Sequence, residues 1–265
     1  MKKPKIALLS ICLNPNYWPY AQRLYESVEQ NFLKGYKIDK YVWSDMPEAH
    51  SFGATVFDTE PAIWPLPTLM RYHLFLREEE TLAKYDYLLY IDIDMVVVGE
   101  VGDEIIPEKG LVAAIHPMYT TKEGHRYAPF EPNPDSTAYI DEERFWKNPT
   151  AYYAGGFQGG TSKAFIKAMK QMKKNTDIDF SKNYIARWND ESHWNKYLHD
   201  YKKPEVVLDP SYIYPDSLIE EYYNPIWPKD HGYTPKIMTI TKPFTLSKEG
   251  GQHVQETIQK FKNEN

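Results

Sequence analysis

The segment from Tyr85 to Val98 constrains the fold of this chain more than any other part of the sequence. Leu88 to Val98 is apolar and β-branched over most of its length, which predicts a buried strand of a parallel sheet. This strand would carry Asp92 and Asp94, which stand at i and i+2 and therefore point to one face. Two like charges buried side by side are costly unless one is neutralised or both bind a cation. The pattern therefore indicates a divalent metal held by both carboxylates, with phosphate oxygens and water as its other ligands.

A second interpretation of the same residues is a turn or a capped strand end, where aspartate is common. An Asp-x-Asp pair alone is a weak signal. Its place between an aromatic-aliphatic strand and a second apolar run favours the metal hypothesis.

The order of the expected elements predicts an α/β fold. Hydrophobic periodicity predicts, in chain order, a strand at Lys5–Cys12, a helix at about Pro19–Phe32, a strand at Lys37–Trp43, a helix at Thr68–Leu82, the Leu88–Val98 strand and a strand at Leu111–Ile115. This β-α-β-α-β order predicts a parallel-rich sheet covered by helices, with ligands at the carboxyl ends of the strands.

The second half of the chain is less regular. Pro117–Thr150 is polar and aromatic, and a stretch of that length inside a compact domain is usually functional. Ser162–Lys174 has an amphipathic helical pattern, Val206–Leu208 is a short strand, and Gly250–Asn265 has a weak helical signal. No repeat or obvious linker divides the 265 residues, so we expect one domain.

Composition narrows the function classes. A net charge of −6, from 31 basic and 37 acidic residues, gives no nucleic-acid footprint. The one cysteine, Cys12, excludes an intrachain disulfide, and no apolar run is long enough to span a bilayer. We therefore expect a soluble, cytoplasmic protein. Aromatic residues make up 15% of the chain, which suits either core packing or stacking on sugar rings, and composition does not decide between these.

The segment Tyr152–Gly160 contains four glycines within six residues. Such glycines serve either a turn or bulge that needs positive φ or a close approach of the backbone to a ligand. The segment lacks the Lys and Ser/Thr of a phosphate-binding P-loop, and it does not match Gly-x-Gly-x-x-Gly after a strand. Nucleotide binding by either of these routes is therefore disfavoured.

Several charged or titratable residues have both a structural and a functional interpretation. The structural interpretation of Asp190 and Glu191 is the first turn of a helix, where acidic residues are favoured. The functional interpretation is that one carboxylate orients a sugar hydroxyl while the other faces a reacting carbon. His116 is by default a structural histidine. Arg71 and Lys242 are by default surface cations, and their functional role would be to neutralise the aspartate pair or a diphosphate.

Taken together, the motifs of this chain resemble glycosyltransferase family 6, which includes the histo-blood-group A and B transferases and the α1,3-galactosyltransferases. The matching motifs, which extend over about residues 5–242, are Trp64 and Arg71, Tyr90–Met95, Val101–Ile105, His116–Pro117, Ser136–Ile140, Tyr152–Gly160, Trp188–Ser192 and Asn195–Tyr197. The resemblance implies a GT-A type fold with a Rossmann-like central mixed sheet. It also implies retaining transfer of galactose or N-acetylgalactosamine from a UDP-sugar, in α-1,3 linkage, to a β-galactoside with or without a fucose.

The resemblance assigns donor-side roles to residues of this chain. Asp92 and Asp94 would hold Mn²⁺ or Mg²⁺ against the UDP diphosphate. Arg71 would tie that region to the donor sugar, Lys242 would pair with the diphosphate, and Asp190 would bind donor sugar hydroxyls. A looser match at Ile11, Leu13 and Tyr17 would place uridine there. Residues 1–115 would mainly bind the nucleotide-sugar.

Residues 116–245 would mainly bind the acceptor and perform catalysis. Glu191, beside Asp190, is the candidate catalytic nucleophile, or it stabilises an oxocarbenium-like state in a same-face mechanism. Trp188 would stack on the acceptor galactose and His116 would bind its hydroxyls, with Glu191 also contacting the acceptor.

Donor choice and metal dependence follow from two further positions. Ala154, Gly155 and Gly156 fall where the family selects its donor, and a glycine at the third position leaves room for an N-acetyl group, which predicts UDP-GalNAc over UDP-galactose. Many bacterial members have Asn-x-Asn in place of Asp92-Ile-Asp94, so retention of both carboxylates predicts metal dependence. Because animal members carry a membrane anchor and stem that this sequence lacks, we expect a bacterial or phage-type member.

Two other classes of function use the same residues. A metal-dependent phosphohydrolase or nucleotidyltransferase would use the carboxylate pair, but it leaves Trp188, His116 and the glycine segment unexplained. A non-catalytic glycan-binding descendant would bind sugar without turnover, and the presence of Glu191, Asp92 and Asp94 argues against it.

Overall fold

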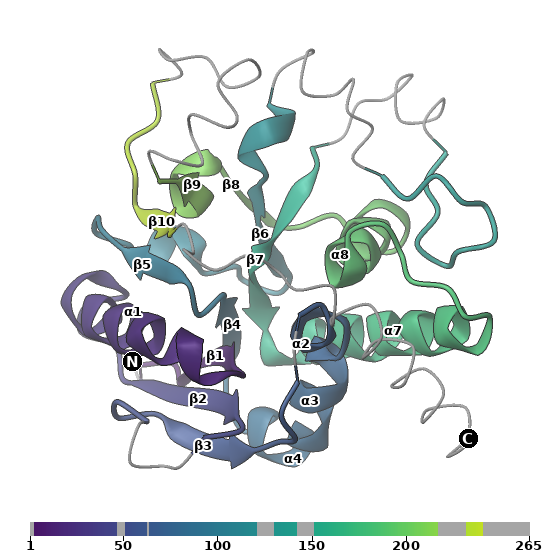
Figure 1. Cartoon of the computed structure of the whole chain (residues 1–265). Helices are drawn as coiled ribbons and strands as arrows, with labels where there is room; N and C mark the ends of the chain where they lie inside the picture. The colour runs from purple at the N-terminus through teal and green to yellow at the C-terminus, as the bar shows by residue number, and fades with distance from the viewer. Residues whose placement is uncertain are drawn as a thin grey trace.

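A seven-stranded mixed sheet forms the centre of the structure, with its strands in the order β3-β2-β1-β4-β7-β6-β8 (Figure 1). A smaller sheet has three strands in the order β5-β10-β9. The structure is a computed structural model, and it describes residues 3–46, 51–62, 64–120, 130–141, 151–216 and 232–240. The α/β class expected from the sequence is confirmed.

The elements of the described ranges have the following bounds. The strands are β1 Ile6–Cys12, β2 Ile38–Ser44, β3 Thr55–Asp58, β4 Tyr87–Ile91, β5 Met95–Val97, β6 Leu111–Ile115, β7 Tyr153–Thr161, β8 Val206–Leu208, β9 Tyr214–Pro215 and β10 Ile237–Thr239. The helices are α1 Trp18–Asn31, α2 Leu66–Leu69, α3 Arg71–Arg77, α4 Glu79–Leu82, α7 Ser162–Ser181 and α8 Asn189–Asp200. Single turns of 3₁₀ helix lie at η1 Pro15–Tyr17, η3 Asp103–Ile105, η4 Pro117–Tyr119 and η5 Pro210–Ile213.

The direction of β7 determines where a site can form. Strands β3, β2, β1 and β4 run parallel, as the expected β-α-β order implies. Strand β7 then lies antiparallel between β4 and β6, and β8 runs parallel to β6. The start of β7 therefore meets the carboxyl ends of β4 and β6 at one edge of the sheet.

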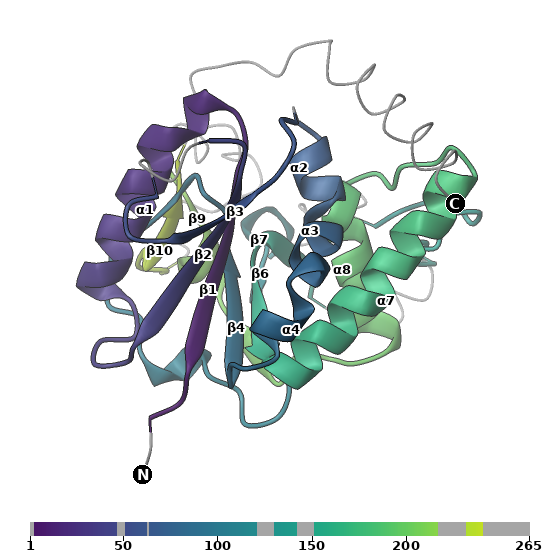
Figure 2. The same ribbon diagram turned by 90° about the horizontal axis from the view of Figure 1, so that it is seen from below.

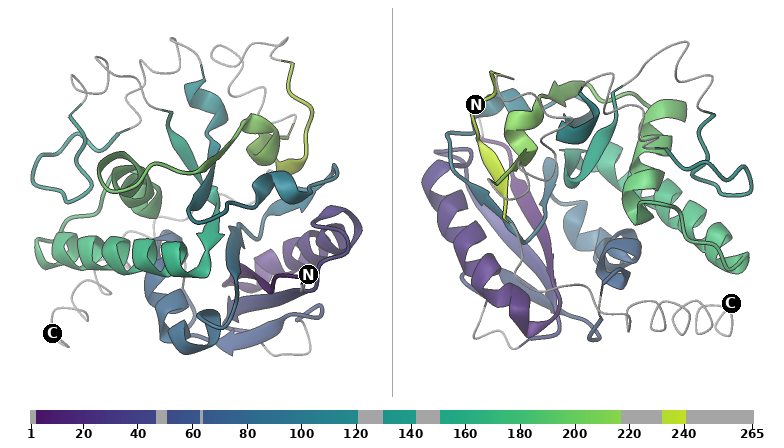
Figure 3. Two further views of the ribbon diagram at one scale, coloured as in Figure 1. Left: turned by 180° about the vertical axis from the view of Figure 1, so that it is seen from behind. Right: turned by 45° about the horizontal axis from the view of Figure 1, so that its top comes forward.

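Helices cover both faces of the central sheet (Figure 2). Ile6 and Leu8 of β1 belong to the apolar cluster that includes α1, whereas Ala7 and Leu9 belong to the cluster that includes α3, α7 and α8. This alternation is the period of two expected of a strand buried on both faces. Figure 3 shows the same layering, with α1 on one side of the sheet and α7 and α8 together on the other.

The expected continuous strand Leu88–Val98 is wrong. Strand β4 ends at Ile91, and the carbonyl of Asp92 accepts a hydrogen bond from the Met95 N–H at 3.2 Å, which closes a turn. The chain turns because β5 leaves the central sheet and pairs with β10 in the smaller sheet. Asp92 and Asp94 therefore lie on a turn after a strand, and they do not share one face of a strand.

The glycine segment is a buried strand and not a turn, and its pairing with β6 shifts register, as at a β-bulge, between Ala113 and Ile115. Strand β7 runs through it in the middle of the sheet. A Cβ at Gly159 would stand 2.6 Å from the carbonyl oxygen of Leu88, and one at Gly160 would stand 2.4 Å from that of Gly110. These two glycines therefore allow the neighbouring backbones to approach closely.

The other predicted elements agree in part. The helix expected at Thr68–Leu82 is divided into α2, α3 and α4, with non-helical dihedral angles at Met70 and Glu78. The helix expected at Ser162–Lys174 is confirmed and continues to Ser181 as α7. Strand β3 was not predicted, and Gly250–Asn265 lies outside the described residues. None of the helices in the described ranges combines the length and the apolar composition that crossing a bilayer requires.

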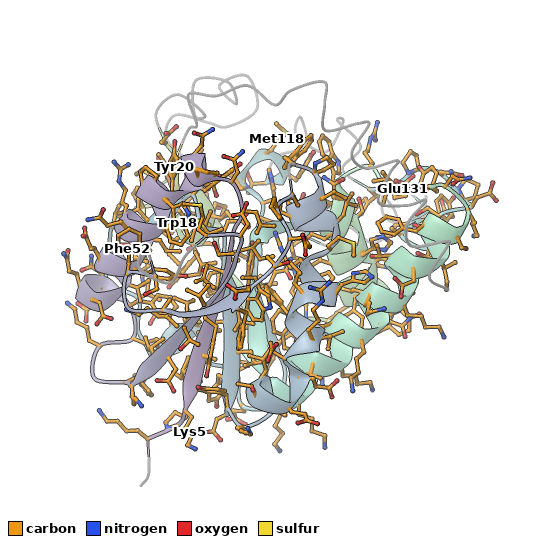
Figure 4. All side chains as sticks on the ribbon, turned by 60° about the horizontal axis from the view of Figure 1, so that its bottom comes forward. Lys5, Trp18, Tyr20, Phe52, Met118 and Glu131 are labelled. Carbon is orange, nitrogen blue, oxygen red and sulfur yellow. The ribbon has the colours of Figure 1, made fainter. Side chains whose placement is uncertain are left out.

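The two ends of the sheet differ in what lies there. Lys5, just before β1, lies at one end, and Met118, just after β6, lies at the other (Figure 4). Glu131 lies toward the Met118 end. The candidate functional residues gather at this second end.

Candidate active site

The edge where β4, β6 and β7 meet is closed by two backbone hydrogen bonds. The Asp92 N–H donates to the carbonyl oxygen of Gly156 at 2.9 Å, and the His116 N–H donates to that of Tyr152 at 2.9 Å. Residues from three separate parts of the sequence are thereby brought together: the aspartate turn, the end of β6 and the glycine segment. The sequence predicted each as a candidate but gave no reason for their contact.

Arg71 lies at the centre of this edge, so its default interpretation as a surface cation is wrong. It is 2% exposed, and its Nη1 donates to the carbonyl oxygen of Gly155 at 2.6 Å. Its Nη2 donates to Asp92 Oδ1 at 3.1 Å, and Nη1 forms an ion pair with Asp190 Oδ2 at 2.7 Å. The guanidinium also lies 4.0 Å from the centre of the Tyr90 ring, a cation–π geometry. Arg71 therefore joins the aspartate turn to the start of α8.

The charges around Arg71 fix its ionisation. Burial alone would lower the pKa of Arg71, but Asp190 and Asp92 raise it above its ordinary value. Burial raises the pKa of Asp190 to about 7, against the opposing effect of Arg71. Removing either member of such a pair leaves a buried charge uncompensated, which costs several kcal/mol, on the order of 3–5.

Glu191 is oriented by two hydrogen bonds. Its Oε1 accepts from the Tyr152 hydroxyl at 2.7 Å, and its Oε2 accepts from the Gly155 N–H at 2.6 Å. Burial raises the pKa of Glu191 to about 7, and these two hydrogen bonds oppose the rise. Since the Gly155 carbonyl receives Arg71, one glycine holds Arg71 on one side and Glu191 on the other.

Asp190 and Glu191 lie in the first turn of α8, as the helix-terminus interpretation of the sequence predicts. Asn195, one turn further along α8, receives the Tyr153 N–H on Oδ1 at 2.8 Å and donates through Nδ2 to the Tyr153 carbonyl at 2.7 Å. Its Nδ2 also donates to the Glu191 carbonyl at 2.9 Å. This side chain therefore fixes the start of α8 against the start of β7.

An aromatic cluster adjoins Glu191 on the side of β6. The Tyr152 ring packs edge-on against Tyr119 at 4.8 Å and against Phe130 at 5.4 Å between ring centres, and the His116 ring lies 5.9 Å away. His116 Nδ1 accepts from the Met118 N–H at 3.2 Å, so the ring proton lies on Nε2. Burial lowers the pKa of His116 to about 4, which keeps the ring neutral at pH 7.

Trp188 lies at the rim of the site and is 45% exposed. Its backbone N–H donates to Ser192 Oγ at 3.0 Å, and its backbone carbonyl accepts from the Glu191 N–H at 3.0 Å. The backbone N–H of the preceding residue, Arg187, donates to Glu131 Oε2 at 2.6 Å. Glu131 is 1% exposed, so a buried carboxylate holds the segment that presents the tryptophan.

The predicted donor-selecting residues lie on alternate faces of β7, with Ala154 and Gly156 on one face and Gly155, beside Glu191, on the other. Ala154 is 2% exposed and packs in the core cluster on the α1 side of the sheet. A Cβ at Gly156 would stand 2.9 Å from both Asp92 Oδ2 and Ile213 Cδ1. Gly156 therefore allows the Asp92 carboxylate to approach β7, whatever else it allows.

The fit of a metal rests on the two aspartates. In the described part of the chain, no three His, Cys, Asp or Glu side chains gather as a complete metal site. Asp92 Oδ1 accepts hydrogen bonds from Arg71 and from the Tyr90 hydroxyl, while Oδ2 points toward Gly156. The Asp92 side chain is 35% exposed, and Asp94 lies two residues away, 7% exposed. A hard divalent ion that takes its other ligands from phosphate and water fits such a set of oxygens.

The remaining predicted donor residues differ in status. Ile11 and Leu13 are 6% and 4% exposed, and their side chains pack in the core. Tyr17 ends the single turn η1 and is half-buried. Lys242 lies outside the described residues.

Comparison with known proteins settles the family. The model of glycosyltransferase family 6 matches residues 68–223, more than half of the chain. This chain belongs to glycosyltransferase family 6. The GT-A type fold implied by the resemblance is thereby confirmed together with the mixed seven-stranded sheet.

Several members of the family are similar over most of this chain. The O-antigen biosynthesis glycosyltransferase WbnI of Escherichia coli is 28% identical over 214 residues, which are 80% of this chain and 88% of that protein. The histo-blood group ABO system transferase 1 of Rattus norvegicus is 30% identical over 223 residues, 80% of this chain and 61% of its own length. The globoside alpha-1,3-N-acetylgalactosaminyltransferase 1 of Homo sapiens is 27% identical over 210 residues, with 76% and 58% covered. The match thus spans about three-fifths of the rat and human proteins.

Sequence reasoning assigned no role to the residues that hold the site together. Asn195 stands four residues after Glu191, which places both on one helical face, so this spacing was a usable signal. Tyr152 opens the glycine segment but had no assigned role. Glu131 stands in an irregular stretch, and no sequence pattern marks it as buried.

Proposed function

We propose that this chain is a retaining glycosyltransferase that transfers N-acetylgalactosamine, or galactose, from a UDP-sugar in α-1,3 linkage to a β-galactoside. Membership of family 6 supports the reaction class, and the name of the human relative supports the linkage and the sugar. The observation that carries the proposal is the contact of Arg71 and Glu191 with the two sides of Gly155, beside Asp92 and Asp190. A guanidinium, several carboxylates and an accessible backbone at one edge suit a donor that has both a diphosphate and a sugar.

On the donor side, Asp92 and Asp94 would hold Mn²⁺ or Mg²⁺ together with the diphosphate oxygens. When bound, the metal would neutralise charge on the UDP leaving group. Arg71 restrains Asp92 Oδ1, which leaves Oδ2 as the oxygen available to an ion. Lys242 would add a second cation near the diphosphate.

The uridine end of the donor would lie at the carboxyl end of β1 and the residues that follow it. Because Ile11 and Leu13 bury their side chains, their backbone groups would contact the base, and Tyr17 would add a ring beside it. Residues 1–115 would thus contribute most of the nucleotide-sugar contacts, and residues 116–245 most of the acceptor contacts.

At the reacting carbon, Glu191 is held by two donors and retains acceptor capacity on both oxygens. A fixed carboxylate here either attacks the anomeric carbon or stabilises the positive charge that develops on it, and both routes retain the configuration. Asp190 would accept hydrogen bonds from donor sugar hydroxyls, and its ion pair with Arg71 favours the ionised form that can do so.

The two residues proposed for the acceptor side come from separate parts of the chain, since His116 follows β6 and Trp188 precedes α8. The neutral His116 ring presents an Nε2–H donor to an acceptor hydroxyl. Trp188 offers a half-exposed ring on which a galactose face would stack. A side chain at Gly156 would press on Asp92 and Ile213, so the glycine keeps the aspartate turn uncrowded where the donor sugar would bind, which supports UDP-GalNAc as the donor.

The proposal is tested by measuring UDP release from the purified protein with Mn²⁺. UDP-GalNAc is compared with UDP-galactose as the donor. A panel of β-galactosides is compared with neutral disaccharides that lack galactose as the acceptor. We expect acceptor-stimulated release that favours UDP-GalNAc, and a new α-anomeric proton coupled to galactose C3 in the NMR spectrum of the product. UDP-sugar or diphosphate cleavage that no acceptor stimulates would replace the proposal with a hydrolase. Saturable binding of galactosides without turnover of either donor would replace it with a glycan-binding function.

A further inference from the structure

A second concave region lies away from the candidate active site. It is a groove of about 840 Å³ between the first half of α7 and the last turn of α8, and its floor is the start of β6 and the end of β7. Its strand residues, Leu111 and Thr161, are at the opposite ends of β6 and β7 from His116 and Tyr152. At about 3.3 Å per residue, the two sites are roughly 15 Å apart along β6.

The rim of this groove is strongly basic. Six lysines line it: Lys109, Lys163, Lys167, Lys170, Lys174 and Lys202. Four of them follow one another on α7 at spacings of four, three and four residues, which places them on one exposed face of that helix. Glu108 is the one acidic side chain among the described residues that line the groove.

Most of these lysines are not neutralised by neighbouring carboxylates. Lys170 pairs with Glu79 at 2.6 Å. For Lys163, Lys167 and Lys202, no carboxylate of the described residues lies within ion-pair distance. The whole chain has a net charge of −6, so this face has the opposite sign to the molecule as a whole. Its charge is complementary to an anion.

The groove also contains an aromatic platform. Tyr197 and Tyr201 stack with their ring centres 5.4 Å apart and an interplanar angle of 17°. Tyr197 is buried, whereas Tyr201 is 57% exposed, so one ring supports the other and leaves an outer face open. A flat, fixed ring of this kind packs against the C–H face of a sugar at little entropic cost.

We propose that this groove binds an acidic saccharide chain, with the lysines pairing its carboxylate or phosphate groups and Tyr201 stacking on a sugar ring. The hollow shape favours a chain that enters it over a flat bilayer, because a bilayer contacts protruding parts of a surface. The groove thus adds a second glycan contact at the far end of α8 from Trp188. This inference does not depend on the reaction at Glu191.

The test is direct binding, measured by titration calorimetry of the full chain with hexagalacturonate, which has one carboxylate per sugar. Neutral maltohexaose serves as the uncharged probe, and phosphatidylglycerol vesicles serve as the membrane arm. We expect saturable binding of hexagalacturonate that weakens in 0.5 M NaCl, because exposed charge pairs are screened, and no binding of maltohexaose. The double variant Lys163→Gln/Lys167→Gln should weaken binding about tenfold, and Tyr201→Ala should weaken it about fivefold.

The matched control is Lys34→Gln/Lys37→Gln, which removes the same charge from exposed lysines between α1 and β2. Its affinity for hexagalacturonate should equal that of the parent protein. Equal weakening in both double variants would reduce the effect to net charge and overturn the site. Binding of vesicles but not of hexagalacturonate would assign the face to a membrane and also overturn it. Turnover of small acceptors should not change in any of these variants.

Discussion

The Tyr152 hydroxyl should set the pH at which this enzyme becomes active. The variant Tyr152→Phe removes the 2.7 Å hydrogen bond to Glu191 Oε1 and keeps the ring that packs against Tyr119 and Phe130. A hydrogen bond to a charged group contributes about 1.5–3 kcal/mol, which corresponds to roughly 1–2 pKa units. Because the bond favours the ionised form, its loss should raise the pKa of Glu191 from about 7 to roughly 8–9.

The consequence for activity follows from the ionised fraction of Glu191. In the parent protein kcat/KM should rise as the pH passes through about 7, because Glu191 loses its proton there. At pH 7 the ionised fraction in Tyr152→Phe falls from about half to between about 1% and 10%, so kcat/KM should fall roughly 5- to 50-fold. At pH 9 the two proteins should differ by no more than about twofold, because Glu191 is then at least about half ionised in both.

The assay is UDP release from pH 6 to 9 with saturating metal and an acceptor below its KM. Tyr197→Phe, which removes a hydroxyl from α8 away from Glu191, is the control and should keep the parent profile. A deficit of equal size at every pH would show that Tyr152 acts through structure and not through the ionisation of Glu191. An unchanged profile would show that Glu191 ionisation does not limit the reaction.

Three further changes test the site. Arg71→Met leaves Asp190 and Asp92 without their cation, so the free energy of unfolding at pH 7 should fall by about 3–5 kcal/mol. The loss should be smaller at pH 5, because Asp190 is protonated there. An equal loss at both pH values in urea titrations would contradict the ion-pair account. Gly156→Ala places a Cβ against Asp92. The preference in kcat/KM for UDP-GalNAc over UDP-galactose should therefore fall at least ~10-fold. An unchanged ratio would show that Gly156 does not take part in donor selection. Asn195→Ala leaves the peptide groups of Tyr153 without their partners and should lower the melting temperature by roughly 2–10 °C. Asn195→Asp keeps one acceptor, so its melting temperature should lie between those of Asn195→Ala and the parent protein. Equal melting temperatures of Asn195→Ala and the parent would contradict this role.

The sequence was sufficient for those parts of the fold that depend on local pattern. The apolar runs of β1, β2 and β6 and the amphipathic face of α1 predict these elements within a few residues, whereas for β4 and α7 the pattern predicts only where the element begins. The turn at Asp92–Asp94 was not predicted, because it exists only where β5 pairs with β10, about 140 residues later in the chain. Strand β7 and its antiparallel direction were not predicted either, because its glycines give no hydrophobic period from which a strand can be recognised.

The candidate site shows the same division. Asp92, Asp190, Glu191 and His116 were found from residue type and motif, and the structure brings them to one edge of the sheet. The sequence allows Arg71 to be either a surface cation or a cation that neutralises the aspartate pair. Its burial decides between these interpretations, and that burial depends on partners about 20 to 120 residues away in the sequence. A buried charge looks like a surface charge in a sequence, because its environment is a tertiary property.

The central claim is that UDP-sugar chemistry takes place at the edge formed by the aspartate turn, and it is tested most directly with Asp92→Asn/Asp94→Asn. The measurement is acceptor-stimulated UDP release from UDP-GalNAc, by parent and variant, in Mn²⁺ and in EDTA. The parent should lose activity in EDTA and regain it with Mn²⁺. The variant should keep the circular dichroism spectrum of the parent and should remain at least ~100-fold less active at any Mn²⁺ concentration. This fold-change corresponds to a loss of about 2.7 kcal/mol of transition-state stabilisation. Full activity of the variant, or of the parent in EDTA, would contradict the claim.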